Sequence, residues 1–197
     1  RGDVVGHGLI GKKGGRAGCP MIDVGDGIVL RRWRAGDLDA LLRHANDEEV
    51  SRGTSDRFPF PYTPADAEAF LAGRVVDFTN PVFAIEVGGE ACGSIGARPG
   101  QGERRAGAEL GYWLGRRLWG RGLMTRIVGV FAPWAMHELQ LYRLQASALD
   151  FNIGSARVLL KNGFTEEGTQ RCAVLKRGRL HDLRTFARTR KDLADAP

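Results

Sequence analysis

The residue types best suited to chemistry gather in one basic, glycine-containing stretch, residues 115–122. An apolar run leads into it, and apolar residues at helical spacing begin at Leu123. A strand, a glycine turn and a helix start expose backbone N–H groups, and these donors and the helix dipole stabilise an anion. Gly120 and Gly122 have no side chain, so a phosphate can approach the main chain closely. Three arginines of this stretch add positive charge: Arg116, Arg117 and Arg121. The stretch predicts a phosphate-binding turn.

A family resemblance supports this interpretation. Residues 117–122 read Arg-Leu-Trp-Gly-Arg-Gly, which resembles the pyrophosphate-binding motif Gln/Arg-x-x-Gly-x-Gly/Ala of the GNAT acyltransferases. Residues 109–114, Glu-Leu-Gly-Tyr-Trp-Leu, look like the family's fourth strand. Residues 152–164 match the signature Asn-x-x-Ser…Lys-x-Gly-Phe of the RimJ/RimL-like branch, which includes N-terminal acetyltransferases of ribosomal proteins. The resemblance covers residues 28–190 and implies acetyl-CoA as the acyl donor, with no metal.

The resemblance also implies where acetyl-CoA binds. In these enzymes the acyl-CoA lies in a V-shaped gap between two splayed parallel strands, here 109–114 and 142–148. The pantetheine arm would pair with the edge of the first strand, and a backbone N–H near Trp113 or Leu114 would polarise the thioester carbonyl. Arg117 belongs to the motif, and the pyrophosphate would lie on the amides that follow it: Leu118, Trp119, Gly120, Arg121, Gly122 and Leu123.

Two residues of the second motif have implied roles in the same gap. Ser155 occupies the position from which the branch donates a proton to the departing CoA thiolate, and Asn152 would hold the pantetheine. Either residue can equally be a helix N-cap, and the two roles are compatible. Two cysteines, Cys92 and Cys172, suggest a covalent route, but neither has a neighbouring histidine in the sequence. Direct attack in a ternary complex is therefore preferred.

The acceptor amine must be neutral to attack, so a base is needed. Glu109 is the candidate, working through water, although it can instead pair with an arginine at the strand end. Some related enzymes carry a second carboxylate where this chain has Val174, and Asp182 and Glu166 are weaker substitutes. This modest capacity to remove a proton suits an α-amine, with a pKa of about 8, better than a lysine amine, with a pKa of about 10.4.

A proline-stiffened loop, residues 55–62, borders the acceptor pocket in the branch. Phe58, Phe60 and Tyr62 are predicted to line it, although phenylalanines here can also be core anchors. His181, beside Asp182, matches a pair common in the last hairpin of the branch, and a structural role is the alternative to catalysis.

The pattern of elements predicts an α/β (α+β) GNAT fold. Its mixed, mostly antiparallel sheet would have two splayed parallel strands and helices on both faces. Further strands are expected at 28–34, 82–87, 91–97, 170–176 and 181–189, and helices begin at Asp37, Thr63, Leu123 and either Asn152 or Ser155. Pro133 should kink the third of these helices or end its regular part, because proline removes a hydrogen bond to Gly129.

Composition sets the remaining limits. The 197 residues suit one domain, predicted at 23–192 between a flexible Gly-rich basic leader, 1–22, and a tail, 193–197. A near match to a phosphate-binding loop in the leader lacks its Ser/Thr and a preceding strand, so it is dismissed.

Three widely spaced cysteines favour a reduced cytoplasmic protein, and no apolar run is long enough for a membrane span. The net charge of +6 gathers toward both ends, which can attract nucleic acid or be solvated surface.

The resulting hypothesis is an acetyl-CoA-dependent N-acetyltransferase that acts on a protein or peptide N-terminus, as a monomer or homodimer and in association with the ribosome. The enzymatic alternative transfers an acetyl or succinyl group to a small amine such as an antibiotic, polyamine or amino acid. A more remote alternative is a non-catalytic module that binds acyl-CoA or RNA. The pair Asn152 and Ser155 argues against a pure binder, because binding needs no leaving-group donor.

Overall fold

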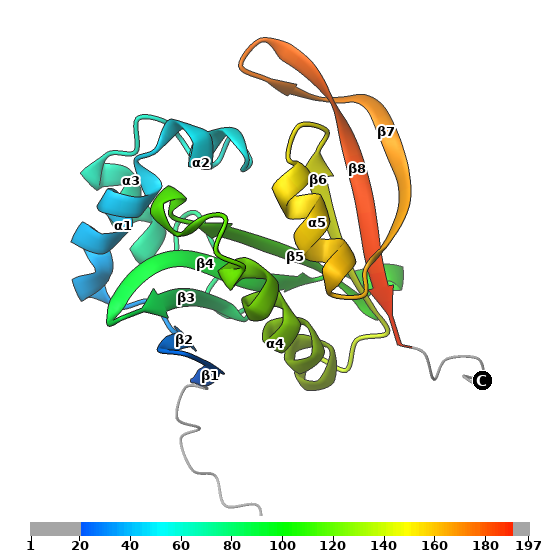
Figure 1. Ribbon diagram of the computed structural model, residues 1–197, viewed down its shortest axis with the longest axis horizontal. Coiled ribbons are helices and arrows are strands. Elements are labelled where there is room, and N and C mark those ends of the chain that lie inside the picture. The colour runs from blue at the N-terminus through cyan, green and yellow to red at the C-terminus, as the bar shows by residue number, and fades with distance from the viewer. Residues whose placement is uncertain (1–20, 191–197) are drawn as a thin grey trace, which may run out of the picture.

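The computed structural model describes residues 21–190, which form one eight-stranded sheet with helices on both faces (Figure 1). The strands lie side by side in the order β1-β2-β3-β4-β5-β6-β8-β7. Their bounds are β1 Ile22–Gly25, β2 Ile28–Arg31, β3 Val82–Val87, β4 Glu90–Pro99, β5 Gly107–Leu114, β6 Arg143–Leu149, β7 Thr165–Lys176 and β8 Arg179–Thr189. This arrangement confirms the predicted GNAT fold class.

The centre of the sheet contains its one parallel pair among the described residues. β5 and β6 pair only over Gly107–Glu109 and Arg143–Gln145, after which the two strands diverge. All other neighbouring strands are antiparallel. The diverging strands leave one edge of β5 without a strand partner along its second half, which is the gap that the sequence predicts.

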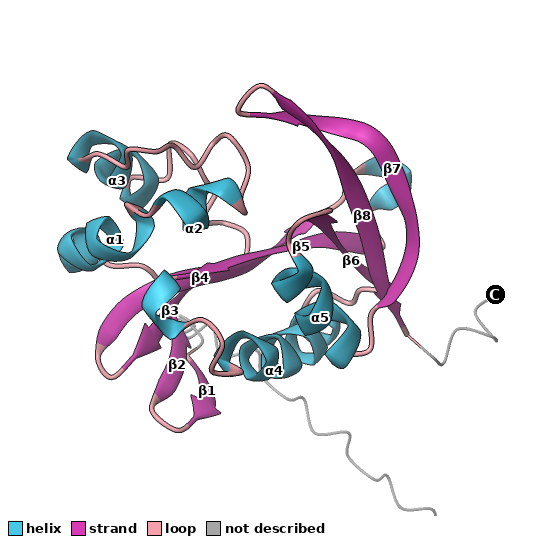
Figure 2. Ribbon diagram, turned by 45° about the horizontal axis from the view of Figure 1, so that its top comes forward, coloured by secondary structure: helices cyan, strands magenta, loops and turns pink. Residues whose placement is uncertain are grey.

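The helices divide between the two faces of the sheet (Figure 2). The first three lie over one face: α1 Leu38–Ala45, α2 Glu48–Arg52 and α3 Pro64–Leu71. The other two cover the opposite face: α4 Leu123–Glu138 and α5 Ile153–Lys161. Short 3₁₀ turns occupy Ala35–Asp37, Gly102–Arg104 and Arg116–Leu118. No helix within residues 21–190 has the length and apolar character of a membrane span.

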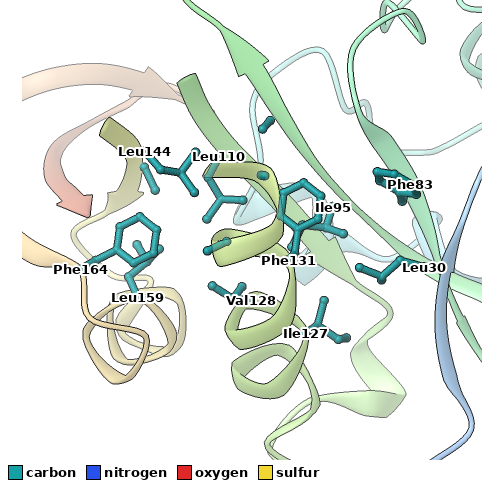
Figure 3. Close-up of a cluster of buried hydrophobic side chains, with 14 of the residues drawn as sticks. Leu30, Phe83, Ile95, Leu110, Ile127, Val128, Phe131, Leu144, Leu159 and Phe164 are labelled. Atoms are coloured by element: carbon teal, nitrogen blue, oxygen red, sulfur yellow. The ribbon is translucent and has the colours of Figure 1, made fainter. Parts of the chain in front are cut away.

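The main hydrophobic core lies between the sheet and α4 (Figure 3). Ile127, Val128 and Phe131 point from α4 toward the strands and are fully buried, in agreement with the predicted helical spacing. Leu159 of α5 and Phe164 close the core beside them. This packing fixes the first turn of α4 against the end of β5, so the glycine turn between them has a defined position.

Local sequence signals explain several element boundaries. Thr63 accepts a hydrogen bond from the Asp66 N–H while the Asp66 carboxylate accepts one from the Thr63 N–H, which is the predicted capping box. Gly163 has φ +76° directly after α5, as expected for a helix C-terminus. The β3–β4 and β7–β8 hairpins also form where predicted, but β7 starts at Thr165, five residues before the expected position.

Two predictions near the N-terminus were wrong. The strand expected at 28–34 ends at Arg31, because the Arg31 guanidinium turns to bind Asp37 and the chain enters a 3₁₀ turn at Ala35. β1 was missed, and it starts inside the predicted leader. Only Val24 of its four residues is buried, so it carries little apolar signal. The rest of the predicted leader and the tail lie outside the described residues.

Pro133 does not end α4, which continues for five more residues to Glu138. Pro133 and Gly129 both lie on the exposed side of the helix. Water can therefore bind the Gly129 carbonyl that proline leaves without a donor, which reduces the cost of a proline inside the helix.

Candidate active site

The glycine turn has the backbone conformation that its sequence suggests. Gly120 has φ +73° and Gly122 has φ +75°, a left-handed region in which side chains are strained. Gly122 is the N-cap of α4, and no side chain caps that end. A Cβ built at either glycine meets no atom within 4 Å, so the space above the turn is open. The first N–H groups of α4 therefore remain available to an anion.

The edge of β5 that faces the gap presents specific N–H groups. The Gly115 N–H donates to the Cys92 carbonyl at 2.7 Å, and hydrogen-bonded positions alternate along an antiparallel pair. Trp113 therefore points its N–H toward β4, whereas Tyr112 and Leu114 point theirs toward β6. Of the two residues predicted to supply the carbonyl donor, only Leu114 directs its N–H toward the gap.

Trp119 fastens the turn to the end of the same strand. Its indole Nε1–H donates to the Leu114 carbonyl at 2.7 Å while the ring stays 46% exposed. Leu118 packs against the main core. Two backbone bonds also hold the turn, because the N–H groups of Leu118 and Trp119 donate to the carbonyls of Gly115 and Arg116 at 2.9 and 3.1 Å. Arg117 and Arg121 remain exposed on its surface.

Tyr112 and Ser155 meet across the gap between the diverging strands. The Tyr112 hydroxyl lies 2.9 Å from the Ser155 Oγ and 3.3 Å from the Ser155 carbonyl oxygen. Burial raises the pKa of Tyr112 to about 12, although the bond to Ser155 acts in the opposite direction. Tyr112 is therefore a protonated donor over the whole physiological range. The sequence interpretation identified Ser155 but missed Tyr112, which it treated only as part of the strand.

Asn152 has the capping geometry that was one of its two expected roles. Its Oδ1 accepts a hydrogen bond from the Ser155 N–H at 3.1 Å, and α5 begins at the next residue. Ser155 consequently sits in the first turn of α5, where the helix dipole stabilises negative charge. The cap orients the helix start that carries the Ser155 hydroxyl.

Glu109 lies in the cavity wall at the point where β5 and β6 separate. It forms an ion pair with Arg98, its cross-strand partner on β4, so the arginine pairing considered from the sequence is present. Its side chain is 43% exposed, so water has access to the carboxylate. The other carboxylates considered are already bound: Glu166 to Arg184, and Asp182 to the Cys172 N–H.

The predicted acceptor loop contributes two of its three aromatic residues to the cavity. Phe58 packs against Tyr62 and Trp113 with ring centroids 5.1 and 5.2 Å apart, and all three line the cavity. Phe60 does not line it. The Phe60 ring is 43% exposed and lies 5.8 Å from the guanidinium of Arg177, because the turn before Tyr62 directs it outward. In this structure Phe60 therefore lies outside the wall of the cavity.

A contact missed at the sequence level joins this loop to the β7–β8 hairpin, which arches over the molecule in Figure 1. The Lys176 ammonium donates to the Thr54 carbonyl at 2.6 Å and pairs with Asp56 at 3.0 Å. Its side chain is only 5% exposed. Beside it, Arg177 binds Glu48. The hairpin and the loop are therefore fastened together at the edge of the cavity.

His181, also considered for catalysis, has a structural environment. Its Nδ1 lies 3.1 Å from the Asp150 Oδ1, and its ring packs edge-on against Phe151 with centroids 4.9 Å apart. It does not line the cavity. The residue is best explained as a link between β8 and the loop before α5.

The glycine turn, the end of β5, the start of α5 and the rings of Phe58 and Tyr62 border a single cavity of about 1550 Å³. This volume exceeds the ~300–1,000 Å³ of a typical small-molecule site, so it has room for two substrates. Tyr112 and Ser155 lie on the α5 side of β5, and Phe58 and Trp113 lie on the α3 side. The unpaired edge of β5 runs between the two sides. Two reactants that enter from opposite faces of the sheet can therefore meet there.

Comparison with known proteins identifies the class to which this fold and site belong. Residues 28–165 match the family model "Acetyltransferase (GNAT) domain", and the chain belongs to this family. It is an N-acetyltransferase, and acetyl-CoA is the acyl donor of this family.

Two curated relatives come from Bacillus subtilis (strain 168). The chain is 40% identical over 80 residues to a probable N-acetyltransferase, YjcK, a match that spans 41% of this chain and 44% of YjcK. It is 30% identical over 131 residues to a putative ribosomal N-acetyltransferase, YdaF, covering 63% of this chain and 71% of YdaF.

Two solved structures share the fold at 20% identity. RimL, a ribosomal L7/L12 alpha-N-protein acetyltransferase in complex with CoA, superposes with a TM-score of 0.76 over 86% of this chain and 98% of its own. The microcin C7 self-immunity acetyltransferase MccE, in complex with acetyl-CoA and AMP, superposes with a TM-score of 0.73 over 84% of this chain and 94% of its own. The neighbours thus act on different acceptors, and the likeness does not fix the acceptor of this chain.

Proposed function

We propose that the enzyme acetylates the α-amino group of a peptide or protein N-terminus, as a member of the RimJ/RimL-like branch. The observation that carries this proposal is the single cavity that reaches the unpaired edge of β5 from both faces of the sheet. It accommodates acetyl-CoA on the Tyr112 and Ser155 side and an extended acceptor on the Phe58 and Trp113 side.

On the donor side, the pyrophosphate would lie on the glycine turn and the first N–H groups of α4. The pantetheine arm would follow the edge of β5, where Tyr112 and Leu114 direct their N–H groups. Asn152 would support the arm through its amide and would keep Ser155 in place. A donor N–H that faces the gap can stabilise the oxyanion of the tetrahedral intermediate.

The chemical step follows from these positions. The neutral amine forms the C–N bond to the thioester carbonyl carbon, and the C–S bond then breaks. The departing thiolate takes the proton of the Ser155 hydroxyl, Tyr112 replenishes it through their hydrogen bond, and a proton from solvent then restores Tyr112. The proton lost by the new amide leaves through water beside Glu109. Burial raises the pKa of Cys92 to about 11, which disfavours an acyl-cysteine intermediate at that residue.

The choice of an α-amine rests on the limited means of removing a proton. Glu109 is paired with Arg98, and the apolar Val174 lines the cavity where related enzymes have a carboxylate. An α-amine, with a pKa of about 8, is partly neutral at pH 7–8, whereas a lysine amine at about 10.4 is almost fully charged. The names of YdaF and RimL agree with this choice.

A small amine is the second candidate, and one contact favours it. Lys176 fastens the β7–β8 hairpin to the loop at Thr54 and Asp56, which restricts the space beside the acceptor side of the cavity. A bound mononucleotide in MccE shows that a relative of this fold accepts a compact molecule.

The deciding experiment measures thiol release from acetyl-CoA and succinyl-CoA with three acceptors: a peptide with a free N-terminus and an internal lysine, the same peptide with its N-terminus blocked, and a panel of small amines. We expect mass spectrometry to locate the acetyl group on the α-amine, with much slower lysine acetylation. Equal or faster modification of the lysine would contradict the proposal. Turnover of small amines with no peptide product would support the second candidate.

A further inference from the structure

A cluster of three metal-ligand side chains lies outside the substrate cavity. His44 from the last turn of α1, with Glu90 and Cys92 from the start of β4, each offer one ligand atom, and these atoms lie within 4.8 Å of one another. The cluster adjoins the turn that follows β5, because the Gly115 N–H donates to the Cys92 carbonyl at 2.7 Å. It uses none of the residues assigned to acetyl transfer.

The imidazole of His44 is incompletely satisfied. The residue is 7% exposed, and its Nε2 is a buried polar atom without a hydrogen-bond partner among the described residues. Such atoms are rare in folded proteins, and a bound ion is one way in which a protein satisfies them. The same Nε2 lies 3.3 Å from the Glu90 Oε1, within ion-pair distance but without the geometry of a hydrogen bond.

The spacing of these atoms agrees with tetrahedral zinc. Ligand bonds of about 2.0–2.2 Å place a nitrogen and an oxygen of one tetrahedron about 3.4 Å apart, close to the distance between His44 and Glu90. The Cys92 Sγ currently makes a weak hydrogen bond of 3.2 Å to the Glu90 carbonyl oxygen. Zn²⁺ would replace that bond with a zinc–sulfur bond, and the thiol proton would pass to solvent.

We propose that His44, Glu90 and Cys92 bind one Zn²⁺ ion, with a water molecule as the fourth ligand. Imidazole, carboxylate and thiolate are all zinc ligands in proteins. Arg43 is the charged neighbour of the site and forms an ion pair with Glu90. Its side chain is 50% exposed, so it can move to the second carboxylate oxygen when the ion binds the first.

The position of the ion gives it a structural role. A Cβ at Gly115 would lie 2.3 Å from the His44 Nδ1, so the ring rests directly against the backbone of this glycine. Zn²⁺ would therefore tie α1 to β4 immediately behind the turn that precedes the glycines at 120 and 122. The ion lies outside the path of the acetyl group and is not required for transfer.

The test uses Co²⁺ as a spectroscopic substitute and Zn²⁺ itself, with the full chain. Cys19 and Cys172 are replaced by serine together, which leaves Cys92 as the remaining thiol. We expect this double variant to bind one Co²⁺ and to show both a thiolate-to-cobalt charge-transfer band and the intense visible bands of tetrahedral cobalt. Zn²⁺ should abolish these bands at one equivalent and raise the melting temperature.

Adding Cys92→Ser should remove the charge-transfer band and weaken Zn²⁺ binding by about 100-fold or more, since even residues that only orient metal ligands contribute about 10–100-fold. His44→Gln should weaken binding comparably while the circular dichroism spectrum remains that of the folded protein. Absence of one-equivalent binding, or a band that survives Cys92→Ser, would overturn the proposal.

Discussion

The contact between Tyr112 and Ser155 connects two parts of the chain that are 43 positions apart. If the two hydroxyls form one proton path, Ser155→Ala should lower kcat by about 100-fold or more, a usual contribution of general acid catalysis. Tyr112→Phe should lower kcat by a smaller factor. The double variant should be no slower than Ser155→Ala, because residues that act as a unit are not additive. Single-turnover thiol release measures the three values, and additive losses would show that the hydroxyls act separately.

The protonation state of Tyr112 predicts the shape of the pH profile. Because burial raises its pKa to about 12, Tyr112 stays protonated as the pH increases from 6 to 10. The acceptor α-amine loses its proton near pH 8 over the same interval. We therefore expect kcat/KM to rise with pH and then to level off without a fall below about pH 10. A decline between pH 8 and 9 would contradict the assigned state of Tyr112.

The role of the glycine turn can be tested with a closely matched control. Gly120 and Gly178 have φ values of +73° and +75°, and a Cβ at either one meets nothing within 4 Å. Glutamate therefore brings similar backbone strain at both positions. Only Gly120→Glu would add bulk and negative charge where the pyrophosphate is expected. We expect it to abolish CoA binding in calorimetry, while Gly178→Glu retains it. Equal affinities would place the pyrophosphate elsewhere.

The sequence predicted the structural position of some single residues but not of others. The glycines of the turn and the capping residues Asn152 and Thr63 were predictable, because their roles depend on neighbours a few positions away. Tyr112 was missed because its partner is distant in the chain. The exposed position of Phe60 could not be predicted either, because local sequence does not show which way the ring turns.

At the scale of elements, the β7–β8 hairpin is tied to the loop between α2 and α3 by the buried ammonium of Lys176. Lys176→Met should cost about 1–3 kcal/mol, because the Thr54 carbonyl loses its charged donor. The released loop should raise KM for the acceptor while KM for acetyl-CoA stays the same. Arg179→Met, at the exposed start of β8, is the control and should leave both values unchanged. An unchanged acceptor KM in the Lys176 variant would show that the contact between the hairpin and the loop does not influence acceptor binding.

The elements themselves were largely predictable, whereas their contacts were not. Alternating and helical apolar spacing located β3 to β6 and α4, since each repeats over several residues. The contact between Lys176 and Asp56 could not be predicted from the sequence, because the two residues are 120 positions apart. Of the two outcomes predicted for Pro133, an end of the regular helix is excluded, because α4 continues to Glu138.

At the scale of the whole molecule, a buried ion-pair cluster fastens the sheet to the first helix. Arg31 of β2 makes two hydrogen bonds of 2.8 Å to Asp37 and also pairs with Glu86 of β3. The side chains of Arg31 and Asp37 are 6% and 9% exposed. Such pairs can be neutral relative to apolar residues, but removing one partner leaves a buried charge without its full compensation. Glu86 remains on Arg31, so Asp37→Asn should lower the free energy of unfolding by about 3 kcal/mol, the lower end of the usual cost of breaking a buried pair.

The same cluster predicts how this difference depends on pH. Burial opposes ionisation of Asp37, but hydrogen bonds from Arg31 and Arg34 outweigh it and hold the pKa of Asp37 below 3.8. A lowered folded-state pKa contributes stability that is complete above the unfolded value and is lost as the pH falls toward the folded value. The difference in the free energy of unfolding between wild type and Asp37→Asn should be constant near pH 7 and should become smaller below about pH 4. Urea unfolding from pH 7 to pH 3 measures it, with Asp39→Asn on the exposed side of α1 as a control expected to change the stability by less than about 0.5 kcal/mol. If this difference in the free energy of unfolding instead increased on acidification, Asp37 would not be a charged partner of Arg31 in the folded protein.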